Sequence, residues 1–483
     1  MAARSFIDAD SVDILESPDA VLSTLDLEGN RKWIYPTLSK GPFYRQRLVM
    51  GWGLIVLFVA LPILRINGRP AILLDFIHRE FALFGITFYP TDTFLLLLLG
   101  LSALVFVILL TALLGRVWCG WGCPQTVYLE FVFRPIERWI EGKEHVRKRR
   151  DEGPWTLDKA WRKVAKWGIY LAISLALAHV FVSYFVGWDR LIEWMTGPPT
   201  EHWGFFVLMA VTTALVLYDF GYFREQMCTI ACPYARIQSV LVDEDSMIVS
   251  YDPRRGEPRA RRSKKKIEQE EAGLIPKQGD CIDCFACVRT CPTGIDIRDG
   301  LQMECIACTQ CIDACDEIML NIGKPPGLIR YTSEHELEGL KTRILRPRTV
   351  IYAGLFLTVM TMLGVGVVSR GAFDVNVGRA VGEPFVELPD GTVANRLRFR
   401  VRNQTPSAAT FEIEAVEPAE AEVKIVGVQP VPLASAEMKR VEAFVVVPRA
   451  LFAGADRRDA VFRIVFSDGS EQIVPFPLLG PSQ

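Results

Sequence analysis

Five stretches of the sequence are long and apolar enough to cross a lipid bilayer as helices. A bilayer core about 30 Å thick requires roughly 20 residues of α-helix. The second and fifth stretches hold no charged residue, and five such runs in one chain are not expected of a soluble protein. The pattern therefore predicts a membrane protein. The predicted spans are Leu48–Leu64, Phe94–Leu114, Gly168–Gly187, Trp203–Phe220 and Thr349–Val368.

Positively charged residues in the connections predict the orientation of these spans. The connection 115–167 holds twelve Lys and Arg residues, whereas 188–202 holds one. The tail up to residue 47 holds six, and the connection 65–93 holds three. Because Lys and Arg collect on the cytoplasmic side, the N-terminus is predicted inside and, after five spans, the C-terminus outside. We expect a multi-pass protein of a bacterial inner membrane with a periplasmic C-terminal part.

After Arg370 the sequence alternates apolar and polar residues with the period of a β-strand. Asn395–Arg402 places four arginines on one face and apolar residues on the other. Phe411–Ala415 alternates with the opposite charge, so these two runs are expected to pair. About seven short strands predict an immunoglobulin-like β-sandwich. Further strands are predicted at Glu422–Val426, Val441–Val447, Val461–Phe466 and Gln472–Phe476.

Two connecting segments carry mixed or charged patterns. Ala71–Phe84 mixes apolar with charged residues and predicts a short helix at the outer membrane face. Arg254–Lys266 holds eight basic residues, and it predicts a solvated linker near anionic headgroups. The net charge of −2 gives no reason to expect a nucleic-acid partner.

The cysteines are confined to one part of the chain. All twelve lie between Cys119 and Cys315, and the last 168 residues hold none. Disulfide frameworks belong to small secreted domains, and this distribution does not resemble one. Eight of the cysteines fall within 35 residues. Reduced thiols that bind metal explain this clustering better.

The eight clustered cysteines form two copies of one motif, at Cys281–Pro292 and Cys305–Asp316. Each copy has the C-x2-C-x2-C-x3-C spacing of two-cluster ferredoxins, in which the fourth cysteine binds the other cluster. A zinc site needs only four thiolates and does not explain two tandem copies. The sequence therefore predicts two [4Fe–4S] clusters. Their expected ligands are Cys281, Cys284, Cys287 and Cys315 for one, and Cys291, Cys305, Cys308 and Cys311 for the other.

The remaining four cysteines form a second internal repeat, C-x3-C-P. Cys119 and Cys123 follow the second span, and Cys228 and Cys232 follow the fourth. The spacing of four residues predicts that both thiols of a pair lie on one side of a helical turn. Two pairs at the same membrane depth are expected to converge into a four-thiolate site for copper or iron–sulfur, or a reversible dithiol. Packing thiols are the alternative.

Histidine is scarce in the chain. His179 lies in the third predicted span, and His78 lies in the connection before the second. An ionisable group within a membrane is a functional candidate. A haem would need two histidines at matching depth, so an ordinary hydrogen-bonded histidine is the favoured interpretation.

These motifs resemble the membrane polyferredoxins of the CcoG/FixG/RdxA family. Asp316, where ordinary ferredoxins have proline, is typical of that family, and the likeness covers nearly the whole chain. The segments that carry it are G-R-V-W-C-G-W-G-C-P-Q-T-V at 115–127, C-P-T-G-I-D-I-R-D-G-L-Q at 291–302, C-I-D-A-C-D at 311–316 and L-I-R-Y-T at 328–332.

The resemblance implies an accessory protein of cbb3-type cytochrome oxidase that reduces Cu(II) to Cu(I) during copper delivery. It implies that Cys119, Cys123, Cys228 and Cys232 form the copper-facing or electron-relay site, with copper or a third cluster bound. The implied partners are the oxidase or its copper chaperones, together with an unidentified cytoplasmic electron donor. A homo-oligomer is left open.

Two other functions fit the same residues. One is a quinol-linked electron relay to a periplasmic reductase, with the aromatic-rich connection Phe76–Tyr89 bordering a quinone pocket. The other is a structural assembly factor, in which the outer sandwich docks the oxidase and the clusters only stabilise the fold.

The predicted architecture is a multidomain membrane protein with about five helical spans, a cytoplasmic two-cluster ferredoxin-like α+β module and an all-β sandwich. Its parts are a cytoplasmic tail at 1–47, four spans at 48–220 with the first C-x3-C-P in the loop 115–167, a segment at 221–276 with the second C-x3-C-P and the basic linker, the ferredoxin module at 277–325, a cytoplasmic linker at 326–348, the fifth span at 349–368 and the periplasmic sandwich at 370–483.

Overall fold

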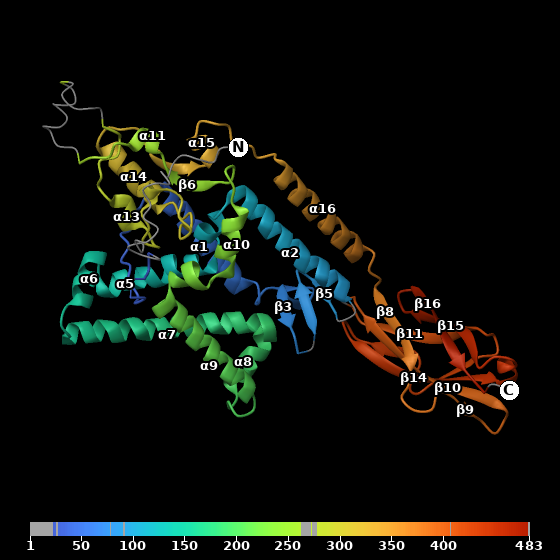
Figure 1. Ribbon diagram of the computed structural model, residues 1–483. Helices are drawn as coiled ribbons and strands as arrows, with labels where there is room; N and C mark the ends of the chain where they lie inside the picture. Colours follow the sequence, from blue (N-terminus) through green and yellow to red (C-terminus); the bar gives the residue numbers. More distant parts are fainter. Residues whose placement is uncertain are drawn as a thin grey trace. The chain divides into compact units, whose positions relative to one another are not determined.

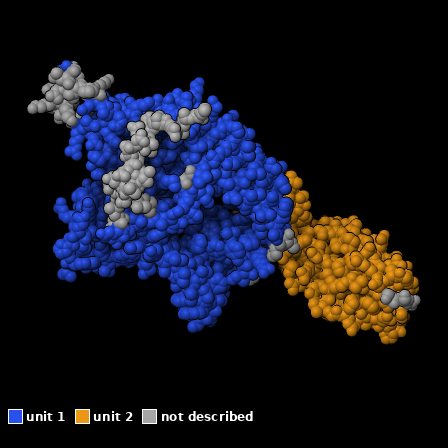
Figure 2. Space-filling model, in the orientation of Figure 1, with its two compact units in different colours: residues 1–65, 70–363 blue, residues 66–69, 364–483 orange. Residues whose placement is uncertain are grey.

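The computed structural model describes residues 23–25, 28–77, 79–89, 92–261, 272, 278–405 and 407–481. The chain divides into two compact units, which Figure 2 colours separately. Residues 1–65 and 70–363 form the first unit, and residues 66–69 and 364–483 form the second. The first unit is mainly helical and holds all twelve cysteines, whereas the second is built of β-strands (Figure 1).

Among the described residues, five helices are long and apolar enough to cross a membrane, which confirms the predicted number. The first ends at Ala60 and not at Leu64, because Pro62 has no backbone N–H with which to continue the helical hydrogen bonds. The third begins at Leu157, eleven residues before the prediction, where the Thr156 hydroxyl accepts a hydrogen bond from the Lys159 amide (3.2 Å). The spans are α1 Pro42–Ala60, α2 Thr93–Leu114, α7 Leu157–Val186, α9 Trp203–Tyr218 with its π-helical extension η3 Asp219–Phe223, and α16 Pro347–Val368.

The helix predicted between the first two spans is wrong. This connection forms a small antiparallel sheet of β3 Ile72–Asp75, β4 Glu80–Leu83 and β5 Ile86–Phe88. Gly85 adopts a positive φ of 88° in the turn between β4 and β5. The two turns of this sheet lie so close together in the sequence that the segments between them are too short for a helix. His78 lies outside the described residues. The two-residue strands β1 Arg65–Ile66 and β2 Arg69–Pro70 precede the sheet.

His179 lies in α7 and is half-buried in the structure. Its Nδ1 lies 2.6 Å from the backbone oxygen of Leu175, one turn earlier in the same helix. This is the ordinary hydrogen-bonded histidine that the sequence favoured.

The eight motif cysteines lie in a small α+β module of the first unit. The antiparallel strands β6 Ile248–Tyr251 and β7 Ile329–Thr332 pair at its base. Cys281, Cys287 and Cys315 belong to its apolar core. The strands come from outside residues 277–325, so the module gathers sequence from both sides of the motifs. Its helices are α13 Ala286–Thr290, η5 Ile297–Asp299 and α14 Gln310–Asn321.

The module is fixed to the membrane-proximal helices by buried polar contacts. Asp313 in α14 accepts hydrogen bonds from the backbone amides of Phe43 (3.1 Å) and Tyr44 (2.7 Å), in the first turn of α1. These amides have no partner within α1, so the carboxylate satisfies them as a capping residue would. Gly41 allows the approach, because a Cβ there would lie 2.3 Å from the Asp313 carboxylate.

A second set of buried contacts holds the other side of the module. Glu130 and Arg134 form a buried ion pair one helical turn apart. Arg134 also donates to the backbone oxygen of Pro292 (3.2 Å), and Gln310 donates to Glu130 (3.2 Å). Because Pro292 and Gln310 each neighbour a motif cysteine, these contacts fix the position of the cysteine loops against the helices. The helices on this side are η2 Leu129–Phe133, α5 Arg134–Glu141 and α6 Glu144–Glu152.

The second unit is a sandwich of two antiparallel sheets, as the alternation predicted. One sheet has the order β12-β14-β10-β8, with β9 on β10, and the other has the order β13-β11-β15-β16. Leu397, Phe399 and Val401 of β10 are fully buried in its core. The strands are β8 Phe373–Arg379, β9 Val386–Glu387, β10 Thr392–Asn403, β11 Ala409–Glu417, β12 Glu422–Ile425, β13 Val431–Leu433, β14 Met438–Pro448, β15 Arg457–Phe466 and β16 Glu471–Leu479, with the 3-10 turn η6 Arg449–Phe452 between β14 and β15.

The pairing predicted between the two oppositely charged runs is wrong. β10 and β11 lie in opposite sheets. Arg396 of β10 forms its ion pair with Glu442 of β14, and Glu414 of β11 pairs with Arg463 of β15 (2.8 Å). Complementary charge matches each strand with its own sheet neighbour. It does not determine which of several complementary strands becomes that neighbour.

Candidate metal centre

The two cysteine motifs fold into loops of the same shape. Four non-glycine residues adopt the left-handed conformation at equivalent places: Asp283 (φ 52°) and Phe285 (57°) in the first loop, and Ala307 (52°) and Thr309 (60°) in the second. Each costs of the order of 1–2 kcal/mol, and such strain persists where the surroundings require it. Where right-handed and left-handed backbone conformations alternate along a loop, the backbone amides point into a concavity. In the second loop the Ala307 amide donates to the sulfur of Cys305 (3.5 Å).

The loops enclose two small cavities that sort the eight cysteines into two sets. Cys287 lines both cavities. The other lining residues include Ile282, Met319 and Leu328 in the first cavity and Ile295 and Ile306 in the second, so both walls are largely apolar. Four thiols in an apolar wall fit a four-iron cluster. The first cavity is lined by Cys281, Cys284, Cys287 and Cys315, and the second by Cys291, Cys305, Cys308 and Cys311 together with Cys287.

Burial controls the protonation of these thiols. It raises the pKa of Cys287, Cys308 and Cys315 to about 12 each, and that of Cys305 to about 11. Neighbouring thiols act in the same direction. Metal ligation requires the thiolate, so the positive charge of bound iron must displace these protons.

The C-x3-C-P pairs repeat in structure as they do in sequence. Cys123 (φ −66°, ψ 126°) and Cys232 (φ −70°, ψ 112°) adopt nearly the same extended conformation, which a following proline favours. Each pair therefore spans a helix end, whereas the sequence predicted one continuous turn. Cys119 lies in α3 Val117–Trp121 and Cys123 precedes α4 Pro124–Tyr128, while Cys228 lies in the π-helical turn η4 Met227–Ala231 and Cys232 precedes α10 Pro233–Leu241.

The two pairs lie close enough to influence one another electrostatically. Burial is the main cause that raises the pKa of Cys119 to about 12, and the neighbouring Cys123 thiol is the second. Burial also raises the pKa of Cys228, and the other three thiols add to the effect. The Cys119 thiol donates to Oε1 of Gln238 (3.4 Å). Within the described ranges, no three His, Cys, Asp or Glu side chains converge as tightly as a single metal ion requires.

The first C-x3-C-P loop packs directly against the loop of the second motif. A Cβ on Gly120 would lie 2.6 Å from the backbone oxygen of Ile306 and 2.8 Å from Cα of Cys308. The two backbones are therefore in van der Waals contact, which only glycine permits. The sequence analysis did not single out Gly120, although its place between two motif cysteines was a usable signal.

Side chains on both sides of Gly120 strengthen the contact between the loops. Arg116 donates to the backbone oxygens of Met303 and Cys305, the latter at 3.3 Å. Trp121 donates through its indole nitrogen to the Tyr331 hydroxyl (2.9 Å), which in turn donates to the backbone oxygen of Ala307 (3.2 Å). The thiol loop and the cluster-motif loop thus form one continuous structure.

Two families with iron–sulfur descriptions match the segments that hold all twelve cysteines. The family described as "4Fe-4S dicluster domain" matches residues 223–334. The family described as "4Fe-4S binding domain" matches residues 96–147. The family described as the IG-like fold at the C-terminal of FixG matches residues 363–475, which run from the end of α16 through most of the sandwich.

Three curated proteins resemble the chain over most of its length. Protein RdxA of Cereibacter sphaeroides is 38% identical over 79% of this chain and 81% of its own. Protein RdxB of the same organism is 37% identical over 86% and 87%. The nitrogen fixation protein FixG of Rhizobium meliloti is 33% identical over 88% of each.

The chain belongs to the FixG/RdxA family. As a FixG/RdxA protein it carries a 4Fe–4S dicluster domain, helices fit for multiple membrane spans and an immunoglobulin-like C-terminal domain. The family relationship supports membrane electron transfer.

Proposed function

We propose that this FixG/RdxA protein takes electrons through two [4Fe–4S] clusters and reduces Cu(II) to Cu(I). The cluster module lies on the cytoplasmic side and the sandwich in the periplasm of a bacterial inner membrane. The reaction serves copper delivery to a cbb3-type cytochrome oxidase, with the oxidase or its copper chaperones as partners. The family relationship and the charge distribution of the connections support this proposal.

The cluster ligands follow the two cavities. Cys281, Cys284 and Cys287 hold one cluster with Cys315, and Cys305, Cys308 and Cys311 hold the other with Cys291. Bound clusters of this kind store and transfer single electrons. The chain keeps both cavities small and apolar, and its backbone amides stabilise the sulfurs.

The contact at Gly120 carries the proposal. Gly120 directly follows Cys119, and its backbone touches the backbone of Cys308 with no solvent layer between the loops. Electron transfer between metal centres needs short, fixed separations. The hydrogen bonds of Arg116 and Trp121 hold this separation constant.

We propose that Cys119, Cys123, Cys228 and Cys232 hold a third iron–sulfur cluster, and that copper meets this cluster as substrate. The Cys123 sulfur accepts hydrogen bonds from the backbone amides of Gln125 and Thr126. The Cys305 sulfur likewise accepts one from the amide of Ala307. Amides aimed at sulfur are typical of iron–sulfur sites. Cys119 and Cys123 lie in the segment that matches the family described as "4Fe-4S binding domain", which supports a cluster over bound copper.

Removing one thiol pair tests this function. Anaerobically purified protein, reduced with dithionite, desalted and given Cu(II), is expected to form Cu(I) that a colorimetric chelator detects. In the Cys119→Ala/Cys123→Ala variant we expect the rate to fall to less than about a tenth of the wild-type rate. Met227→Leu, which removes a sulfur beside Cys228 but no thiol, is the matched control. An unchanged rate in the double variant would exclude these thiols from the reaction.

A further inference from the structure

A cavity of about 530 Å³ opens beside the loop of the second cluster motif. Arg116, Met303, Cys305 and Ala307 form its inner wall. Its volume lies within the usual range of small-molecule sites, about 300–1,000 Å³, and its surface is more apolar than polar. Nothing in the proposed path from the clusters to copper uses this cavity.

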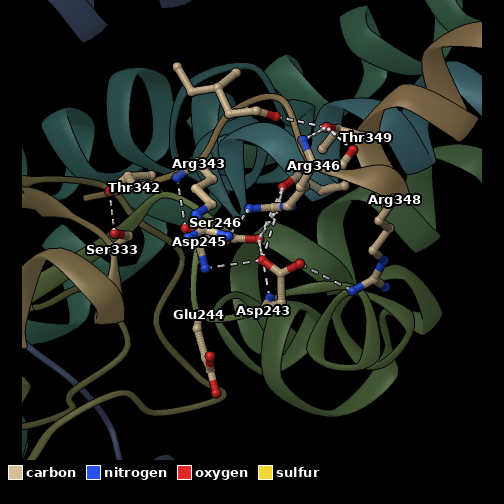
Figure 3. Close-up of polar contacts among 12 residues, drawn as sticks. Asp243, Glu244, Asp245, Ser246, Ser333, Thr342, Arg343, Arg346, Arg348 and Thr349 are labelled. Atoms are coloured by element: carbon tan, nitrogen blue, oxygen red, sulfur yellow. Dashed lines mark hydrogen bonds and ion pairs between the residues drawn. The ribbon is translucent and has the colours of Figure 1, made fainter. Parts of the chain in front are cut away.

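The outer wall of the cavity is tied to the ends of two membrane spans, as Figure 3 shows for its polar contacts. The Ser246 hydroxyl donates to the backbone oxygen of Ala112 (3.0 Å), in the last turn of α2. Arg346, which precedes α16, donates to the same oxygen (2.6 Å) and pairs with Asp243 (2.9 Å). Met247, also in the wall, donates through its amide to Leu113 (3.4 Å). The cavity therefore lies where the spans end.

The charges around the cavity restrict its ligand. Of its four carboxylates, Asp243 pairs with arginines, while Glu244 and Asp245 contact His335. The carboxylate of Glu334, in the short helix α15 Glu334–Leu337, has no hydrogen-bond or ion-pair partner among the residues that the structure describes. Among the lining residues Arg116 is the one cation, and its guanidinium already donates to backbone oxygens. The wall therefore offers no free cation to an anionic carrier such as a nicotinamide or flavin nucleotide.

We propose that this cavity binds a hydroquinone drawn from the membrane and is the place where electrons enter the protein. This inference rests on the proposed electron-transfer function and supplies the electron donor that the function needs. An uncharged, lipid-soluble carrier fits the apolar wall, the volume and the position at the span ends. It differs from the pocket that the sequence suggested at Phe76–Tyr89, which belongs to a different part of the chain.

The reaction balances with copper as acceptor. One hydroquinone loses two electrons and two protons and becomes the quinone. The electrons leave one at a time through the Cys305 loop, and two Cu(II) ions become two Cu(I) ions. Glu334 receives the two hydroxyl protons in turn and passes the first to solvent before it takes the second. Burial, and then the nearby Glu244 and Glu338 carboxylates, raise the pKa of Glu334 and so favour its protonated form.

The test is reduction of the cluster-loaded protein by duroquinol under anaerobic conditions, followed by the loss of absorbance near 400 nm. Met303→Trp fills the cavity from a side chain that is 58% exposed, and we expect reduction to slow by about tenfold or more. Leu320→Trp, at a 65% exposed position outside the cavity, should match the wild type. Glu334→Gln should also slow duroquinol oxidation, while dithionite reduces all variants equally.

Two results would overturn the inference: no reduction of the wild type by duroquinol, or equal rates in the wild type, Met303→Trp and Glu334→Gln. Copper reduction by dithionite-treated protein is measured in parallel and does not involve the cavity. If duroquinol reduction does not depend on the cavity while copper reduction is intact, only the inference about the cavity is wrong. If duroquinol reduction depends on the cavity but no copper is reduced, only the proposed function is wrong.

Discussion

Replacing Gly120 by valine is expected to leave the clusters in place and to abolish most copper reduction. The added side chain would enter the backbone of Ile306 and Cys308, which lie 2.6 Å and 2.8 Å from the Cβ position. Neither backbone group can rotate away as a side chain can, so the two loops must separate. The longer gap slows electron transfer between the loops, and we expect Cu(I) formation to fall at least severalfold.

Three measurements make this prediction specific. Iron content and dithionite reduction of Gly120→Val should equal those of the wild type, because no cluster ligand changes. Gly53→Val is the matched control, since a Cβ on Gly53 meets nothing within 4 Å. If Gly120→Val keeps its iron and forms Cu(I) at the wild-type rate, the contact between the loops is not the electron path.

The second prediction concerns the exchange of ligands between the two motifs. Cys315→Ala and Cys281→Ala should give the same electron paramagnetic resonance spectrum, because both residues line the first cavity. Cys291→Ala and Cys305→Ala should share a different spectrum, because both line the second. Each variant is expected to lose about four irons or to retain a damaged three-iron centre.

This prediction separates the structure from a simpler alternative, in which each motif supplies all four ligands of its own cluster. That arrangement would pair Cys291 with Cys281 and Cys315 with Cys305. Spectra grouped in that way would contradict the two cavities. Dithionite-reduced samples at matched protein concentration are sufficient for the comparison, and Glu317→Ala, at an exposed position of α14, is the control.

The sequence predicted those features that depend on local spacing. The five spans follow from runs of apolar residues, and the alternation in Asn395–Arg402 predicted a strand whose apolar face is buried. Cysteine spacing predicted two ligand sets; each set lines one cavity, with Cys287 lining both, and the assignment of ligands stays a prediction. In each case the residues that form the feature are close together in the sequence, or their spacing is typical of a known loop.

The features that sequence reasoning missed depend on distant contacts. β10 pairs with β14 and β8 and not with β11, because the topology of the sandwich selects among several strands with suitable charge. The sheet β3–β5 replaced a predicted helix, because closely spaced turns outweigh amphipathic composition. The cavity beside Cys305 is built from residues between Arg116 and Glu334, and no local pattern brings them together.

The iron content of oxygen-protected protein tests the central claim most directly. Twelve cysteines arranged as three cluster sites predict about twelve irons and about twelve acid-labile sulfides per chain. Cys228→Ala with Cys232→Ala should lower both numbers to about eight, with the two ferredoxin-type signals unchanged. A pure wild-type sample that contains no iron, or that keeps the same iron content when Cys228 and Cys232 are removed, would contradict the account.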